Sequence, residues 1–250
     1  MNSKNIFLTI SSFTIAILLI SAGGCTRTND QKVDPITAFA KEEIEKLEQA
    51  NRNTSLNNLR RQSLAMLNYE SANMKFPANA IYSNDGKPLL SWRVAILPYI
   101  QERRLFDQFH LDEPWDSAHN IKLLDQMPKT YLCPDSEHTN KTLYQALVGP
   151  GTIMDGTPRG IGLGSISDGS TNSIMLVETD EEYAQPWTKP ADLKFDPNNP
   201  RNGLGNLRPN GFLAVFCDGS THFIPNTVES QVLKHLALIR DGQVIPKEFK

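Results

Sequence analysis

The chain has 250 residues, three cysteines and a formal net charge of −3. A chain of this length can bury a hydrophobic core that is stable without disulfides. This excludes the class of small domains that depend on disulfides for their stability. The mildly acidic charge offers no basic face to nucleic acid, so we expect no nucleic-acid partner.

Residues 1–24 have the order of a signal peptide: Lys4, then an apolar run at 6–20, then small residues before Cys25. The run is shorter than the about 20 apolar residues of a membrane span. A cysteine at this point resembles a lipoprotein lipobox, although Ala22 stands where Leu is usual. We therefore predict an extracytoplasmic protein, cut before Cys25 and lipid-anchored there to a bacterial membrane. A plain signal peptide or an uncleaved anchor is the alternative.

The stretch 25–33 is short and polar and is predicted to be a tether between the lipid and the domain, which spans 34–250. Helix signals begin at Asp34 and Pro35, an N-cap followed by proline at the first helical position. Two amphipathic runs follow, the second with Leu64, and the polar stretch 51–55 separates them. Residues 34–75 are thus predicted to form one long helix or two helices in series.

Residues 76–227 are predicted to be a strand-and-loop region, because most of the prolines and glycines fall there. Long irregular segments lie at 111–120 and 185–210, and a last helix is expected at about 228–240. A helix followed by such a region favours an α+β fold with antiparallel pairing. The expected strands are 92–97, 143–148, 174–178, 213–217 and 221–224.

Cys133 and Cys217 remain when Cys25 carries lipid. Outside the cytoplasm they could form a disulfide, which would close a long loop and stabilise the fold by about 4–5 kcal/mol in the chain-entropy model. The alternative is two separately buried thiols, because nothing in the sequence reports the distance between them.

The sequence contains no nucleophile elbow, Walker loop, zinc-protease motif or C-x-x-C motif, so we predict no catalytic residue and no cofactor. His110 and His119 lie near several acidic residues, but Pro114 and Trp115 interrupt any regular spacing of metal ligands. We interpret this segment as a polar loop rather than a metal site.

Asp168 and Asp218 are weak calcium candidates, together with the acidic run 180–182, because calcium prefers oxygen ligands. The favoured alternative is that both aspartates cap turns through hydrogen bonds of their side chains. Gly219 follows Asp218 between two apolar runs, a pattern that predicts a two-residue β-hairpin turn.

Short sequence words between about residues 57 and 242 match, in order, those of a known family. They are Asn57-Asn58-Leu59, Phe76-Pro77, Ser91-Trp92-Arg93-Val94-Ala95, Leu111-Asp112-Glu113-Pro114-Trp115-Asp116 with His119-Asn120, Cys133-Pro134, Val148-Gly149-Pro150-Gly151-Thr152, Asp168-Gly169-Ser170-Thr171-Asn172-Ser173, Pro186-Trp187-Thr188-Lys189-Pro190 and Phe216-Cys217-Asp218-Gly219-Ser220. The chain resembles the bacterial prepilin-like family with the H-x9-DG signature, domain of unknown function 1559. The resemblance implies a pilin-like α+β fold, an N-terminal helix packed on an antiparallel sheet with long loop insertions.

Two positions depart from the family pattern. A lipobox replaces the prepilin segment, so assembly into a filament is not expected. Nine residues separate Asp218 from Arg208, where the signature has histidine. An arginine cannot act as a neutral base or a metal ligand there.

We therefore expect a non-enzymatic, lipid-tethered envelope protein that acts by contact with other surface proteins. The loops 111–120 and 185–210 are the expected contact surfaces, since loops on a rigid scaffold commonly carry binding. A calcium-dependent ligand-binding module with Asp168 and Asp218 is the alternative. A hydrolase built from Asp116, Ser117 and His119 is the third possibility.

Overall fold

A computed structural model describes residues 35–246. The chain divides into two compact units, Met1–Ala50 and Asn51–Lys250, each considered by itself. The predicted signal peptide, the tether, Cys25 and the helix cap at Asp34 lie outside the described residues. In the first unit, residues 35–50 are helical, and Lys46 pairs with Glu42 and Glu43 on the exposed helix surface.

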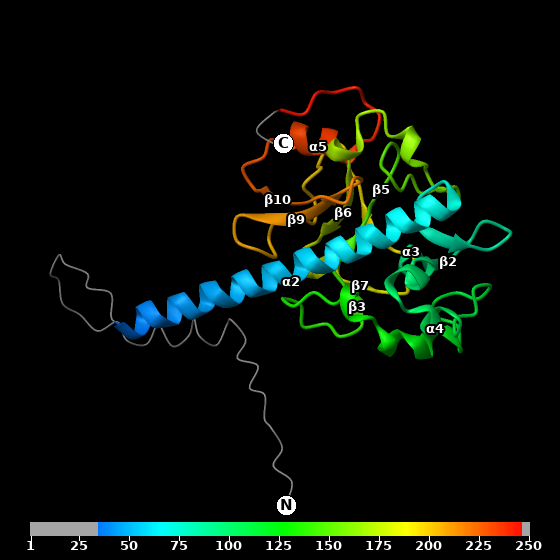
Figure 1. Ribbon diagram of the computed structural model, residues 1–250, viewed down its shortest axis with the longest axis horizontal. Helices are drawn as coiled ribbons and strands as arrows, with labels where there is room; N and C mark the ends of the chain where they lie inside the picture. Colours follow the sequence, from blue (N-terminus) through cyan, green and yellow to red (C-terminus); the bar gives the residue numbers. More distant parts are fainter. Residues whose placement is uncertain (1–34, 247–250) are drawn as a thin grey trace, which may run out of the picture. The chain divides into compact units, whose positions relative to one another are not determined.

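Helix α2 (Pro35–Asn73) is one continuous helix, the first of the two alternatives (Figure 1). In the second unit its inner face consists of Ser55, Leu59, Gln62 and Met66, all fully buried and spaced by three or four residues. The face is therefore half polar, and its polar side chains bond to loops of the domain. Leu64, predicted to be part of the buried face, is 58% exposed because it lies outside this spacing.

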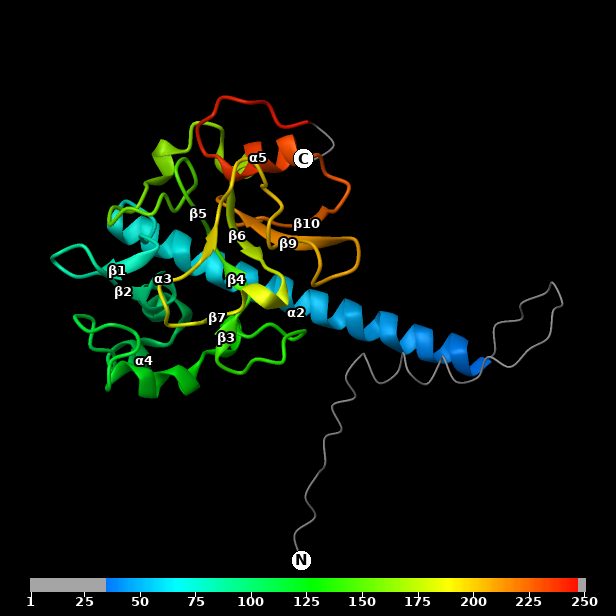
Figure 2. The ribbon, with the colours of Figure 1, turned by 180° about the vertical axis from the view of Figure 1, so that it is seen from behind.

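The main sheet has four antiparallel strands in the order β10-β9-β6-β4 (Figures 1 and 2). They are β4 (Tyr144–Gln145), β6 (Ile174–Glu178), β9 (Gly211–Phe216) and β10 (Thr221–Pro225). Every residue of β6 and β9 is buried, so both faces of the sheet are covered.

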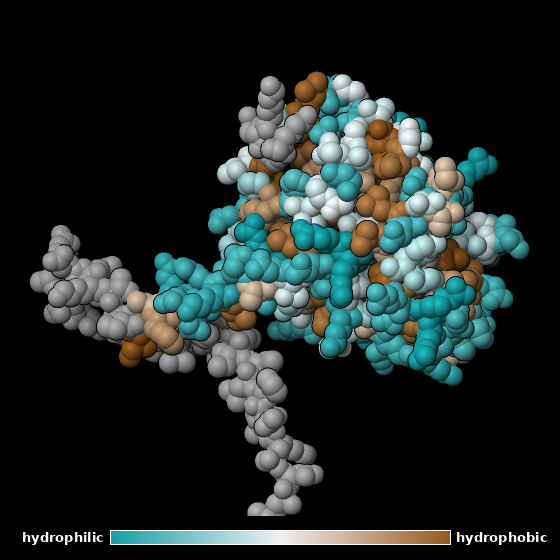
Figure 3. All heavy atoms as spheres, in the orientation of Figure 1, coloured by the Kyte–Doolittle hydropathy of each residue, from teal (hydrophilic) through white to brown (hydrophobic). Residues whose placement is uncertain are grey.

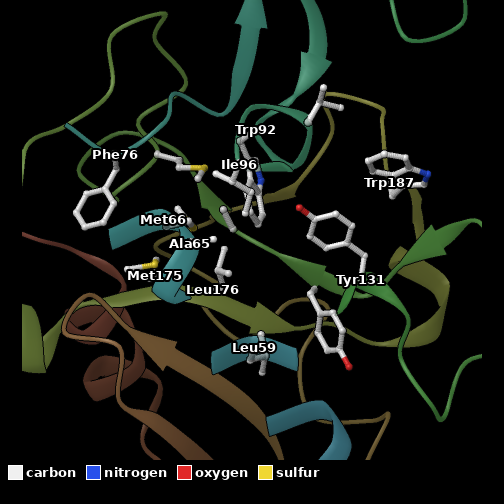
Figure 4. Close-up of a cluster of buried hydrophobic side chains, with 14 of the residues drawn as sticks. Leu59, Ala65, Met66, Phe76, Trp92, Ile96, Tyr131, Met175, Leu176 and Trp187 are labelled. Carbon is white, nitrogen blue, oxygen red and sulfur yellow. The ribbon is translucent and has the colours of Figure 1, made fainter. Parts of the chain in front are cut away.

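Alternate residues of β9 enter two different cores, as expected for a strand buried on both faces. Leu213 and Val215 belong to the core that contains Leu59 and Met66 of α2. The side chains between them pack with Leu233 of helix α5 (Ser230–Ala237). Figure 4 shows the first core, where residues of α2 meet Met175 and Leu176 of β6 and the rings of Phe76, Trp92, Tyr131 and Trp187.

Smaller elements surround the sheet. They include the antiparallel pair β1 (Ala80–Tyr82) and β2 (Pro88–Ser91), the antiparallel pair β3 (Lys141–Thr142) and β7 (Gln185–Pro186), and the parallel pair β5 (Leu147–Val148) and β8 (Leu193–Lys194). The short helices are α3 (Trp92–Ala95) and α4 (Arg103–Phe106), and residues 35–246 also contain six 3-10 turns, among them η2 (Asn120–Gln126). On the face of the second unit shown in Figure 3, hydrophilic residues predominate along α2, with hydrophobic ones scattered among them.

The α+β fold with antiparallel pairing is confirmed. The strand predicted at 92–97 is wrong, because Ser91 caps a helix there by accepting a hydrogen bond from the Arg93 amide. The apolar run is buried on all sides, and periodicity cannot assign such a short run. The run 143–148 is split between β4 and β5, and the last helix covers only Ser230–Ala237.

The predicted hairpin joins β9 and β10. Its turn is longer than the predicted two residues, because the Phe216 amide donates to the Ser220 carbonyl at 2.9 Å. Gly219 has φ +86°, a conformation that other residues adopt only with strain. Between residues 35 and 246, no helix combines the length and apolar character that crossing a bilayer requires.

Candidate functional site

The segment between β2 and β3 contains a closed loop, residues 110–120, that one asparagine holds together. The Asn120 side chain accepts from the His110 amide at 3.0 Å and donates to the carbonyls of His110, Glu113 and Pro114 at 2.9–3.2 Å. Asn120 is fully buried, so these bonds do not compete with water. A side-chain amide combines an acceptor oxygen with two N–H donors, so a single asparagine can make all of these bonds.

Two histidine rings stack where the two ends of this loop meet, a place called the neck of the loop below. The centroids of His110 and His119 are 3.5 Å apart and the rings are within 4° of parallel. His110 Nδ1 lies 2.9 Å from Glu113 Oε1, and His119 Nε2 lies 2.8 Å from the Gln108 carbonyl oxygen. The hydroxyl of Ser117 and the ring of His110 lower the pKa of the Glu113 carboxyl.

The residues proposed for a hydrolase are not brought together as a catalytic group. Ser117 Oγ accepts from the Asn120 amide at 3.0 Å, while His119 is engaged with the Gln108 carbonyl. The Asp116 side chain is exposed. The hydroxyl of Ser117 therefore belongs to the hydrogen bonds that close the loop.

The two loops expected to carry binding meet in the structure. The Trp115 amide donates to the Leu89 carbonyl of β2 at 2.8 Å, and Lys189 Nζ lies 5.9 Å from the centroid of the Trp115 ring. Trp187, from the same loop as Lys189, donates to the Leu124 carbonyl at 2.8 Å. The loops 111–120 and 185–210 thus meet at Trp115 and Lys189, and the surface around this contact is called the paired-loop surface below.

The far end of the 185–210 loop is fixed by Asp180, whose carboxylate is almost fully buried. It accepts from the amides of Asn206 and Leu207 at 2.7 and 3.0 Å and from the Asn206 side chain at 2.9 Å. An open hollow of about 570 Å³ lies beside it, lined by Asp180, Glu181, Glu182, Asn206 and Leu207. Asp180 therefore acts as an acceptor for backbone amides that shapes the loop.

Arg208, at the position of the signature histidine, is buried and pairs with Glu178 at the end of β6. Its Nη2 lies 2.8 Å from Glu178 Oε1, 2.8 Å from Ser55 Oγ and 2.7 Å from Asp135 Oδ2. Burial opposes the charge of Arg208, but the hydrogen bonds and charge of Glu178 outweigh it and raise the pKa of the guanidinium. Arg208 thus joins α2, β6 and two loops. None of these partners was predicted from the sequence.

A second buried ion pair joins α3 to the 185–210 loop. Arg93 Nη2 lies 2.8 Å from Asp192 Oδ1, and both side chains are at most 1% exposed. The same oxygen accepts from the Trp92 indole and from the Ala146 amide at 3.1 and 3.0 Å. Burial raises the pKa of the Asp192 carboxyl in spite of the charge of Arg93.

Cys133 and Cys217 are both free and buried, which is the alternative to the disulfide. Cys133 Sγ donates to Glu178 Oε1 at 3.4 Å, so this thiol belongs to the Arg208 cluster. Burial raises the pKa of both thiols. Neither thiol is thus placed as a nucleophile, because the thiolate is the reactive form.

We therefore expect both thiols of the folded Cys25→Ala variant to react with an aromatic disulfide reagent at least about 100-fold more slowly than in denaturant. The measurement is the thiol count and labelling rate at neutral pH, with and without guanidinium. Two thiols that appear only on unfolding would agree with the structure. Rapid labelling of the native protein, or no thiol even in denaturant, would contradict it.

The two weak calcium candidates have different hydrogen-bond partners. Asp218 Oδ1 accepts from the amide and hydroxyl of Ser220 at 2.9 and 2.6 Å, the turn cap that the sequence favours. Asp168 accepts from the amides of Asp241 and Gly242 at 2.6 and 3.0 Å and so holds the C-terminal segment. Within residues 35–246, no three His, Cys, Asp or Glu side chains are grouped so that they could hold a metal.

Residues 48–160 match the model of a family described as protein of unknown function (DUF1559). The match confirms the resemblance seen in the sequence, and it includes the loop 110–120 and most of the α2 residues that pack on the sheet. The description of this family assigns no molecular function. No curated protein and no solved structure matches the chain.

Proposed function

We propose that the chain is a lipid-anchored extracytoplasmic protein of the bacterial cell envelope that acts by contact with other envelope proteins, not as an enzyme. The observation that carries this proposal is the paired-loop surface. Hydrogen bonds of the Asn120 side chain fix the loop 110–120 from within. Among the residues of the loop that face solvent are Asp112, Pro114 and Asp116. A loop held rigid before binding loses little conformational entropy when a partner binds.

The side chains that most often catalyse reactions have structural partners here. Each of the five histidine rings lies within 3.4 Å of a polar group of its surroundings. The partners are Glu113 for His110, the Gln108 carbonyl for His119, Glu181 for His138, Ser220 for His222, and Asp241 for His235. These contacts hold turns and loops in place, which supports a role through surface shape.

The lipid anchor rests on the sequence of the first 25 residues, which lie outside the described part of the chain. A diacylglycerol on Cys25 would keep the domain at the membrane, where envelope proteins are concentrated. The anchor and the paired-loop surface make separate contributions, membrane attachment and partner recognition, so each can be removed without the other.

Cross-linking in living cells, followed by purification and mass spectrometry, tests both contributions. We expect the wild-type protein to carry a reproducible set of envelope proteins. Cys25→Ala should leave the membrane fraction and lose them. The double change Asp112→Arg and Asp116→Arg should keep the protein at the membrane but lose the partners, because it reverses the charge of the exposed loop.

The matched control is Glu137→Arg, which reverses an exposed acidic residue outside both loops. It should keep both the membrane attachment and the partners. Partners that survive the loop change would contradict the role of the paired-loop surface. Membrane attachment that survives Cys25→Ala would contradict the lipid anchor.

A further inference from the structure

Two stacked imidazole rings lie where the two ends of the loop 110–120 meet. Histidine is the side-chain type that serves most often as a pH switch in proteins. The rings of His110 and His119 face each other at 3.5 Å, and the His110 ring is half exposed, so protons can reach it from solvent. Asn120, next to His119 in the sequence, bonds to the backbone of His110. The rings therefore close the same neck that the asparagine closes through the backbone.

The hydrogen-bond partners assign the proton positions in the neutral rings. The Gln108 carbonyl can only accept, so Nε2 of His119 carries a proton. The ionised Glu113 can only accept, so Nδ1 of His110 carries a proton. Any added proton must therefore bind at Nε2 of His110 or at Nδ1 of His119.

We propose that this stack is an acid-sensitive latch, which releases the loop 110–120 when both rings are protonated. The proposal rests on the proposed function, because this loop is half of the paired-loop surface. One added proton leaves an imidazolium against a neutral ring, a contact that is attractive. A second places two like charges 3.5 Å apart, which opposes the stack.

The charged surroundings differ for the two rings. Glu113 lies directly against His110 and stabilises a positive charge there, while the hydrogen-bond partner of His119 is a neutral carbonyl. The other charged side chains of the neighbouring segments are Asp112 and Asp116 on the loop, Arg103 and Arg104 on α4, Asp107 after α4, and Lys122 on η2. Arg103 and Asp107 form an ion pair at 2.8 Å and largely cancel each other.

The reporter for the latch is Trp115, which lies within the loop and is partly exposed, whereas Trp92 and Trp187 are fully buried. We expect the quenching of tryptophan emission by acrylamide to increase about two-fold in the full-length protein between pH 7.5 and pH 5. His119→Phe keeps a flat ring in the stack but removes one charge, so its quenching should not change with pH. His110→Phe gives the same test should His119→Phe fail to fold.

The control is His138→Phe, which removes a histidine that also lies beside a carboxylate, Glu181. This variant should respond to pH as the wild type does. No increase in the wild type, or the same increase in His119→Phe, would overturn the latch.

The quenching experiment needs no binding partner, so its failure is distinct from failure of the proposed function. If both hold, the wild type should lose its cross-linked partners at pH 5 and His119→Phe should keep them.

Discussion

Replacing Arg208 with methionine is expected to lower the free energy of unfolding by about 3–5 kcal/mol. Glu178 is 1% exposed, and in the variant its carboxylate would keep only the weak thiol donor of Cys133. Asp135 and Ser55 would lose the same guanidinium. A buried carboxylate without a counter-charge is costly because it has left water without compensation. Guanidinium unfolding followed by circular dichroism measures the difference.

The matched control for this prediction is Arg103→Met. Arg103 also forms an ion pair with a carboxylate, Asp107, at 2.8 Å, but both side chains are more than half exposed. Its loss should cost less than about 1 kcal/mol. Adding Glu178→Leu to Arg208→Met should recover part of the stability, because it removes the buried carboxylate that the first change leaves without a counter-ion. Equal costs for Arg208 and Arg103 would show that the buried cluster is not an anchor of the fold.

Replacing Asp192 with asparagine is expected to cost about 3 kcal/mol, because it leaves the charge of the fully buried Arg93 without its counter-ion. The asparagine oxygen can still accept from the Trp92 indole and the Ala146 amide. The change therefore isolates the charge from the hydrogen bonds. Thermal and guanidinium unfolding would give the stability, and native emission of the tryptophans would show that the fold is kept.

The double replacement Arg93→Met and Asp192→Leu should cost much less than the two single replacements together. Asp192 Oδ2 has no hydrogen-bond partner within residues 35–246, and burial raises the pKa of this carboxyl in spite of Arg93. The desolvation of Asp192 is therefore incompletely compensated, and burying an ion pair in this way often gains little over apolar side chains at the same positions. A double variant as unstable as the sum of the singles would contradict this account.

Much of the local structure follows from short stretches of sequence. Asp218 and Gly219 predict a turn, because an aspartate can cap it and a glycine accepts a positive φ. The apolar stretches at 174–178 and 221–224 predict β6 and β10. The loop 111–120 is equally local, since Asn120 bonds to residues six to ten positions before it. The sequence predicts this loop to be a contact surface, but it did not single out the asparagine that closes the loop.

The long-range partners could not be predicted in this way. Arg208 was recognised as the residue in the signature position, but its partners Glu178 and Ser55 lie 30 and 153 residues away in the chain. Arg93 meets Asp192 across 99 residues. The sequence left open whether Cys133 and Cys217 pair, and only the folded chain separates them as two buried thiols.

The sequence by itself determined the α+β class, the hairpin at Asp218 and the resemblance to a family. It also predicts the lipid attachment at Cys25. The tertiary structure alone decided that residues 92–95 are helical, that Leu64 is exposed and that the loops 111–120 and 185–210 meet at Trp115. The physical reason is the range of the forces involved. Turn chemistry and periodicity act over a few residues, whereas burial and charge pairing depend on the path of the whole chain.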